Sequence, residues 1–479
     1  MKSRPMSMSE PASGPAALSR AETAELANRI VGPVRLPDDG GYQSECSTFN
    51  LLSPVRPAVA VGAACVADVQ AAVQFAAERG LPIAVLATGH QMVRSAEGAV
   101  LINMSRLDAV RIDPARSLAR VEGGARWRQV LDEADRHGLA PASGTSPTVG
   151  VVGYHLGGGA SPVLGRMHGY AADHVRAIEV VTADGTLRLV TSGSEPDLFW
   201  ALLGGKSNFG AVTALEFSLF PIERFYGGGL FFAGENAARV LHTWREWVIG
   251  LPMEMSSSIA FLRQPSLPMV PEPLRGKFVM HVRFSSLLPK ESAERVLRPM
   301  RRIAPTVLDT VIDLPYRATG SLFTDPPVPV PWVERSASLQ DFPLEAAEVL
   351  LAVLGPDADT PLRLVELRLL GGALERSSTV PNAVAGRNAR WSLFGAGGGP
   401  ADGIPALREK LTALVDAMAP WSQDEMMPNL LSARQGTTPE ELRAIYGSER
   451  YDRLAAIKGR YDPCNLFRMN HNIIPVRRS

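Results

Sequence analysis

The chain has 479 residues, of which 46% are hydrophobic and 20% charged, and its 49 Lys and Arg side chains balance 49 Asp and Glu side chains. Because one hydrophobic core seldom serves more than about 300 residues, this length predicts two domains. Balanced charge excludes a strong electrostatic field that would attract nucleic acid or an anionic membrane, so we expect neither as a partner. We expect a small-molecule substrate instead.

The N-terminus and the cysteines limit the class of protein further. Residues 1–30 begin as a polar stretch rich in proline and serine, and we expect a mobile tail without the apolar segment of a secretory signal. Cys46, Cys65 and Cys464 are too scattered for a disulfide framework or a paired-cysteine metal motif. These features favour a cytoplasmic protein.

From residue 66 onward, the spacing of apolar residues alternates between helical and strand periods. It predicts helices over Val66–Arg79 and Trp127–His137, and strands over Ala99–Asn103 and Leu118–Val121. Such alternation indicates an α/β or α+β domain.

Within the same region, the stretch Leu81–Gln91 predicts a short buried strand that runs directly into a glycine turn. The turn is Thr88-Gly89-His90, and a glycine there lets backbone N–H groups approach a ligand closely. A neutral imidazole at His90 can carry a proton, bind a metal, act as a nucleophile or only hydrogen-bond its own loop.

The segment 144–173 holds eight glycines interspersed with apolar residues. Ordering it costs chain entropy, so we expect a compensating ligand or tight backbone packing, and a phosphate-bearing cofactor is the natural candidate. Two nucleotide motifs fail on spacing, because Pro162 replaces the third glycine of G-x-G-x-x-G and Trp200 the first glycine of a P-loop before Gly205-Lys206-Ser207. Neither a Rossmann dehydrogenase nor a P-loop ATPase is predicted.

A hairpin over Val175–Thr191 turns at Asp184-Gly185. A helix over Asp197–Leu203 and a strand over Phe209–Phe220 follow, and Pro221 marks a domain edge. Beyond this edge the pattern indicates an antiparallel sheet covered by helices. We expect strands over Gly229–Phe232, Ser257–Leu262, Lys277–Phe284, Leu362–Leu370 and Ala389–Ala396, and helices over Ala237–Val248, Lys290–Ile303, Ile404–Ala417, Pro439–Tyr446 and Tyr451–Gly459.

Five stretches carry a resemblance to a known family: LPIAVLATGHQ, GTSPTVGVVGYHLGGGASPVLGRMHGYAAD, EVVTADGTL, LFWALLGGKSNFGAVT and YDPCNLFRMNHNIIP. In this order they resemble the FAD-linked oxidases similar to berberine bridge enzyme, which have the vanillyl-alcohol oxidase fold. The resemblance implies an α+β, two-domain fold, with an FAD-binding domain over 31–222 and 426–479. An antiparallel-sheet substrate domain would be inserted over 223–425.

The resemblance also implies which residues hold FAD, chiefly through backbone N–H groups of two loops. The implied contacts are Ala87, Thr88, Gly89, His90, Gln91, Ser146, Pro147, Thr148, Val149, Gly150, Gly153, Tyr154 and Gly158, with Val180 by the adenine and Asn472 by the flavin ring. His155, His168 and His174 have irregular spacing without further ligands, so we expect no metal site.

His90 matches the family histidine that bonds to the 8α-methyl carbon of the flavin, which requires an unprotonated imidazole. We expect this covalent bond, with noncovalent FAD as the alternative. Ser146 stands where many relatives carry a cysteine bonded to flavin C6, and a hydroxyl cannot replace a thiolate in that linkage. We therefore expect FAD with one covalent bond, through His90.

The catalytic residues are less well indicated, because Met426–Leu431 lacks the tyrosine that many relatives carry in this region. Glu366 and Arg368 fall on one face of a predicted strand, where they would roof the flavin or form a solvent-side ion pair. Tyr154 is a third candidate, with packing against the flavin as its alternative role.

These expectations combine into an FAD-dependent oxidoreductase of specialised metabolism. It would transfer a hydride from an alcohol or amine carbon to flavin N5, with O2 as electron acceptor. Two alternatives remain open, a flavin-containing cyclase without net redox turnover and a non-catalytic flavin-binding protein.

Overall fold

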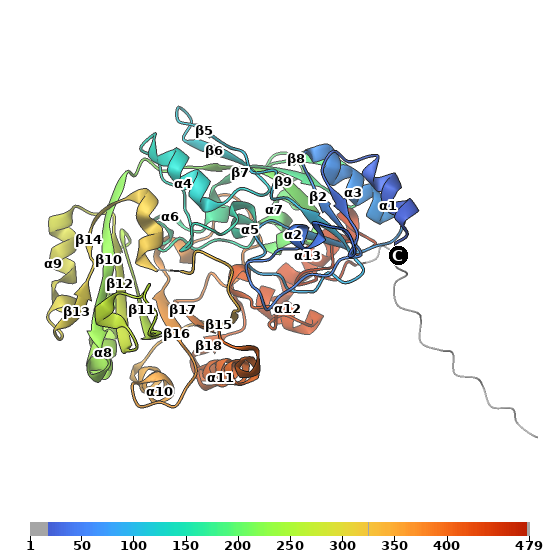
Figure 1. Ribbon diagram of the computed structural model, residues 1–479. Coiled ribbons are helices and arrows are strands. Elements are labelled where there is room, and N and C mark those ends of the chain that lie inside the picture. Colours follow the sequence, from blue (N-terminus) through green and yellow to red (C-terminus); the bar gives the residue numbers. More distant parts are fainter. Residues whose placement is uncertain (1–17, 324, 477–479) are drawn as a thin grey trace, which may run out of the picture.

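The computed structural model describes residues 18–323 and 325–476. The strands of this described part form three sheets (Figure 1). A small, mainly parallel sheet runs in the order β1-β2-β4-β3, with β1 over Val34–Arg35, β2 over Val59–Gly62, β4 over Val100–Asn103 and β3 over Ile83–Leu86. An antiparallel sheet runs β5-β6-β9-β7-β8, over Val110–Asp113, Leu118–Glu122, Ala211–Ser218, Val175–Val181 and Leu187–Val190.

The third sheet, called the large sheet below, is antiparallel and runs β13-β10-β12-β11-β16-β17-β15-β18, with β14 also paired to β10. Its strands are β10 Arg224–Ala233, β11 Met255–Arg263, β12 Phe278–Ser286, β13 Thr306–Asp309, β14 Ile312–Pro315, β15 Val333–Leu339, β16 Leu364–Leu369, β17 Trp391–Gly397 and β18 Ser422–Gln423. The expected antiparallel sheet is therefore present, and β15 is a strand that the sequence pattern did not predict.

Helices lie around and between these sheets. In chain order they are α1 Arg20–Ala27, α2 Tyr42–Glu45, α3 Val66–Glu78, α4 Trp127–Asp135, α5 Val151–Leu156, α6 Gly165–His168, α7 Pro196–Gly205, α8 Ala237–Val248, α9 Lys290–Arg301, α10 Leu344–Leu354, α11 Ile404–Ala417, α12 Pro439–Tyr446 and α13 Ser448–Tyr461. No helix within the described residues has the length and apolar character needed to cross a bilayer.

The large sheet has an apolar outer face and an inner face that is partly polar and partly apolar. On the outer face, alternate apolar residues such as Met280 and Val282 of β12 and Val365 and Leu367 of β16 pack into one core with helices α8, α9, α10 and α11 (Figure 1). The residues between them, including Arg283, point to the other face, called the inner face below. Polar side chains are thus placed on a buried surface of the large sheet.

The C-terminal segment returns to the N-terminal half of the chain. Helices α12 and α13 pack with α5 and α7 in one core, and the Tyr446 hydroxyl donates to the Gly204 carbonyl at 2.9 Å. Figure 1 shows these helices beside the elements of the first half. This packing brings residues near 430 and 470 to the loops around Lys206.

The expectation of a mobile tail over residues 1–30 is wrong for its last part, and residues 1–17 lie outside the described residues. Helix α1 begins at a capping box, in which Ser19 and Glu22 satisfy each other's backbone N–H groups. Leu26 is fully buried, and Arg79, the residue that follows α3, forms an ion pair with Glu25 at 2.9 Å. The cap stabilises the first turn of α1, and the buried Leu26 and the ion pair hold α1 against α3.

Candidate cofactor and substrate cavity

One cavity of about 450 Å³ is lined by residues from three of the five stretches that carry the resemblance, those around His90, Gly150 and Lys206. Twelve expected site residues lie on its wall: Ala87, Thr88, Gly89, His90, Gln91, Ser146, Val149, Gly150, Gly153, Tyr154, Glu366 and Arg368. The wall also includes the loop around Lys206 and the segment Met427–Leu430. The fold therefore gathers both glycine-containing loops and the inner face of the large sheet around one space.

The turn after β3 is built on a glycine that no other residue replaces without strain. Gly89 has a φ of +65°, and a Cβ atom there would lie 2.6 Å from the Thr48 Cα atom. The N–H group of Phe49 donates to the Thr88 carbonyl at 3.1 Å, which fixes the neighbouring chain against the turn. This packing sets the position of His90.

His90 has the properties of a neutral, unpartnered imidazole. Its ring stacks on Phe49 with centroids 4.0 Å apart, and its buried Nε2 atom has no hydrogen-bond partner among the described residues. Burial lowers the pKa of His90 to about 4, and the positive charge of Arg126 acts in the same direction. At neutral pH the ring therefore keeps an unprotonated nitrogen.

Gln91 connects the turn to the C-terminal segment and to a buried lysine. Its Nε2 atom donates to the Leu431 carbonyl at 2.6 Å, and the Lys206 Nζ atom donates to Gln91 Oε1 at 2.8 Å and to Pro428 O at 3.1 Å. Burial lowers the pKa of Lys206 to about 8, although the nearby Glu334 opposes this change. Sequence analysis missed Lys206 and Glu334 as cavity residues, because only the folded chain brings them to Gln91.

The glycine-rich segment is partly helical, since α5 begins just after Gly150. Backbone bonds hold it against α4, where the N–H groups of Trp127 and Arg128 donate to the carbonyls of Val149 and Pro147 at 3.1 and 2.9 Å. Further along, the Gly159 N–H group donates to Asn429 Oδ1 at 2.7 Å. The segment Met426–Leu431, which lacks the tyrosine that many relatives carry, is thus bonded to the glycine-rich segment through Asn429.

Tyr154 lines the cavity but its ring is mainly a packing group. It meets Trp127 edge to face with centroids 5.3 Å apart, and its buried hydroxyl has no hydrogen-bond partner among the described residues. Burial raises the pKa of Tyr154 well above its ordinary value. A phenol in this state is a poor proton acceptor at neutral pH.

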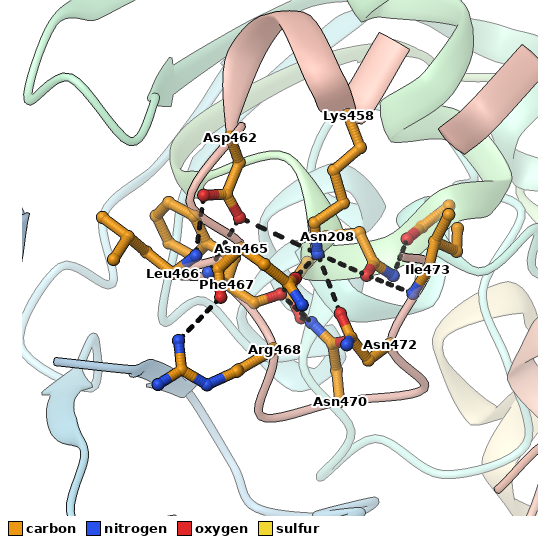
Figure 2. Close-up of polar contacts among 12 residues, drawn as sticks. Asn208, Lys458, Asp462, Asn465, Leu466, Phe467, Arg468, Asn470, Asn472 and Ile473 are labelled. Carbon is orange, nitrogen blue, oxygen red and sulfur yellow. Dashed lines mark hydrogen bonds and ion pairs between the residues drawn. The ribbon is translucent and has the colours of Figure 1, made fainter. Parts of the chain in front are cut away.

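Five expected FAD contacts do not lie on the cavity wall: Pro147, Thr148, Gly158, Val180 and Asn472. Val180 is fully buried, and Asn472 accepts a hydrogen bond from Lys458 Nζ at 3.0 Å. Figure 2 shows the amide of Asn472 directed at Lys458 together with Asn208 and Asp462. Their contact with FAD stays a prediction.

The inner face of the large sheet presents a charged cluster to the cavity. The Arg368 Nη2 atom lies 3.1 Å from Glu366 Oε1, and the Arg283 Nη1 atom lies 3.2 Å from the same oxygen. Burial acts to raise the pKa of Glu366, but Arg368 and Arg283 outweigh it and lower the pKa to about 2. Glu366 is only 5% exposed, so the solvent-side alternative for this pair is wrong.

Asp325 lies beside this cluster on the same wall. Its Oδ2 atom accepts a hydrogen bond from Thr145 Oγ1 at 2.6 Å, and burial raises the pKa of its carboxyl group against the effect of that bond. Sequence analysis missed Asp325 and Arg283. Arg283 had a readable signal, because it interrupts the apolar alternation of β12, whereas Asp325 stands in a proline-rich loop without periodicity.

Comparison with known proteins identifies FAD as the cofactor of the chain. Residues 57–191 match the model of an FAD binding domain, and residues 435–474 match the model described as berberine and berberine like. The (R)-6-hydroxynicotine oxidase of Paenarthrobacter nicotinovorans is 29% identical over 465 residues, covering 93% of this chain and 97% of that protein. The uncharacterized FAD-linked oxidoreductase YgaK of Bacillus subtilis is 26% identical over 94% of this chain and 98% of its own length.

Solved structures agree with these matches. The 6-hydroxy-D-nicotine oxidase of Arthrobacter nicotinovorans superimposes with a TM-score of 0.79 at 25% identity, covering 93% of this chain and 98% of its own. A xylooligosaccharide oxidase of Myceliophthora thermophila shares the fold with a TM-score of 0.80 at 22% identity, over 96% and 100% of the two chains. These matches identify an FAD-dependent oxidoreductase. In sequence and in fold, the chain is similar to the FAD-linked oxidases that resemble berberine bridge enzyme.

The residues on the cavity wall fit FAD as the cofactor. The Gly89 turn and the Gly150 region expose backbone close to the cavity, and the neutral imidazole of His90 has an unsatisfied nitrogen nearby. Both are features that a bound dinucleotide can satisfy.

Proposed function

We propose that the enzyme oxidises a small molecule of specialised metabolism by hydride transfer to flavin N5, with O2 as the electron acceptor. We further propose that FAD is joined to the chain by one covalent bond, through His90. The observation that carries both statements is the neutral, unpartnered imidazole of His90 on the wall of a cavity that also holds a charged cluster. Bound FAD supplies the redox chemistry, and the chain binds and orients the reactants.

His90 supports the covalent bond through its charge state. The bond would replace one C–H bond of the flavin 8α-methyl group and the N–H bond of the imidazole by a C–N bond, which releases two protons and two electrons, and O2 would accept the electrons. An imidazole with a pKa of about 4 offers an unshared electron pair at neutral pH. Stacking on Phe49 holds the plane of the ring.

Ser146 supports a single bond. Its Oγ atom lies 2.9 Å from Thr148 Oγ1, so the hydroxyl already has a hydrogen-bond partner in the folded chain. A serine hydroxyl remains protonated at physiological pH and does not form the linkage that a thiolate forms.

Acid precipitation of the purified protein tests the covalent bond. We expect yellow colour to stay in the pellet of the wild type and of His137→Ala, a histidine variant outside the cavity wall, and to leave the pellet of His90→Ala. Colour released from the wild type would overturn the bond.

Anaerobic mixing with alcohols and amines tests the reaction itself. Bleaching of the flavin absorbance, reversed by air, is the expected result for a substrate. Product formed without bleaching would overturn hydride transfer and indicate a cyclase.

A further inference from the structure

The charged cluster on the inner face of the large sheet has more positive than negative partners. Glu366 is one carboxylate shared by two guanidinium groups, those of Arg283 on β12 and Arg368 on β16. Both guanidinium carbons lie over the ring of Phe323, at 4.7 Å for Arg283 and 5.1 Å for Arg368. The two groups are therefore held side by side on one aromatic ring, facing the cavity that Phe323 also lines.

Arg283 has unused hydrogen-bonding capacity in spite of its burial. It is only 4% exposed, and its Nε and Nη1 atoms have no hydrogen-bond acceptor among the described residues, although Nη1 lies near Glu366. Buried N–H groups without an acceptor are costly, because they lose water and form no hydrogen bond in exchange. An acceptor that arrives with a ligand removes this cost.

Asp325 is the other acidic group next to the cluster, and within the described residues no ion pair joins it to Arg283 or Arg368. Thr145 donates to its Oδ2 atom at 2.6 Å, and burial raises the pKa of its carboxyl group, although that bond and the two arginines oppose this change. Glu366 is therefore the carboxylate that both guanidinium groups share. The N–H groups of Arg283 that lack an acceptor favour an anion over a cation at this part of the cavity wall.

We propose that the substrate carries a carboxylate group and that Arg283 and Arg368 bind it at the inner face of the large sheet. This inference rests on the proposed function, since it names the chemical class of the molecule that is oxidised. Two adjacent guanidinium groups match a planar carboxylate, because their N–H donors can form parallel charge-assisted hydrogen bonds. The oxidisable carbon then lies elsewhere on the same molecule.

Calorimetric titration of the FAD-loaded enzyme with benzoate and with benzamide tests the proposal without turnover. The two probes have the same ring and similar shape, and only benzoate is charged. We expect benzoate to bind about tenfold more tightly or better, the effect of a charge-assisted hydrogen bond. Arg283→Met and Arg368→Met should each remove this preference.

Two further variants sharpen the test. Glu366→Gln keeps the side-chain shape and removes the shared negative charge, so it should strengthen benzoate binding and leave benzamide binding unchanged. Arg224→Met removes an exposed arginine of the same sheet, paired with Asp313, and should change neither. Opposite effects at Arg283 and Glu366 separate a charge effect from general damage to the fold.

Equal affinity of the wild type for benzoate and benzamide would overturn the carboxylate site. Weaker benzoate binding by Glu366→Gln would overturn it too, even if the arginine variants failed to fold. If benzoate is preferred but no alcohol or amine bleaches the flavin, the carboxylate site stands and hydride transfer fails. The two proposals therefore fail by different observations.

Discussion

The imidazole of His90 and the phenyl ring of Phe49 lie face to face, 4.0 Å apart between centroids and 10° from parallel. The chain around Phe49 is tied to the turn itself, because Asn50 N–H donates to the Gly89 carbonyl at 3.4 Å. The orientation of the proposed flavin attachment point is thus set by one turn and the segment packed against it. This relationship makes Gly89 the first position to test.

Gly89→Ala should destabilise the protein and lower its FAD content. The new Cβ atom would lie 2.6 Å from Thr48 Cα, and the backbone has a φ of +65°. We expect a loss of about 1–3 kcal/mol in the free energy of unfolding, from strain and crowding together. Urea unfolding and the ratio of flavin to protein absorbance measure the two effects.

Gly80→Ala is the matched control for Gly89→Ala. Gly80 has a φ of +63°, and a Cβ atom there would meet nothing within 4 Å. It should therefore lose only the backbone part, about 1 kcal/mol, and keep its flavin. Equal losses for both variants would contradict the crowding at Thr48.

Tyr154→Phe should leave stability unchanged or improved and activity within about twofold, because the buried hydroxyl has no partner to lose. Tyr316→Phe is the control, since its hydroxyl donates to the Pro141 carbonyl at 2.6 Å, and it should lose about 1–2 kcal/mol. Urea unfolding and steady-state kinetics check both. A large loss of kcat in Tyr154→Phe alone would restore Tyr154 as a catalytic residue.

Acid should destabilise the protein through two buried histidines other than His90, the proposed site of flavin attachment. Burial lowers the pKa of His155 to about 4 and that of His471 to about 3, whereas unfolded histidine titrates near 6.5. Below pH 6.5 these histidines bind protons in the unfolded chain but not in the folded chain. The free energy of unfolding therefore falls as the pH falls from 6.5 toward 4.

Urea unfolding at pH 7 and pH 5 measures this loss. We expect each of the two histidines to contribute about 2 kcal/mol to the difference, since one pKa unit corresponds to about 1.4 kcal/mol. His155→Asn keeps a donor for the Val151 carbonyl and should reduce the difference by about that amount. An unchanged difference would show that His155 is protonated equally in both states.

Lys458→Met should cost about 3–5 kcal/mol of stability, because it leaves the buried carboxylate of Asp462 without its cation. Lys458 Nζ also donates to Asn208 Oδ1 and to the Phe467 carbonyl, at 3.1 and 3.0 Å (Figure 2). Lys410→Met, an exposed position on α11, should change stability by less than about 0.5 kcal/mol. Comparable losses in both variants would contradict a structural role for this network.

Much of the fold was predictable where one periodicity ran through an element. Helices α8, α11 and α12 begin and end at the predicted residues, and the strand before Gly89 was predicted from its apolar run. Strand β15 was missed because its inner-face residues are polar although buried, and α10 because it is apolar almost all round. Helix α1 begins at a capping box of Ser19 and Glu22, a signal that apolar periodicity alone does not reveal.

The candidate site was predictable where it is local in sequence. The Gly89 turn and the glycine-rich segment supply contiguous parts of the wall, and the pair Glu366 and Arg368 followed from strand alternation. Arg283 lies on β12, which β11 separates from the strand of Glu366 and Arg368, and Asp325 lies in a loop beside the cluster. Such long-range meetings depend on strand order, which no local pattern reveals.

Along each strand of the large sheet, alternate residues face either the helices or the inner face. The positions proposed to bind substrate therefore differ from those that form the hydrophobic core. The outer-face residues form a continuous hydrophobic layer with four helices of the described chain, while intervening positions such as Arg283 and Glu366 touch the cavity. Exchanging one intervening side chain leaves that layer intact, whereas inserting a single residue in a strand would swap the two surfaces. New specificities are therefore open to descendants of this enzyme by point substitution, one alternate position at a time.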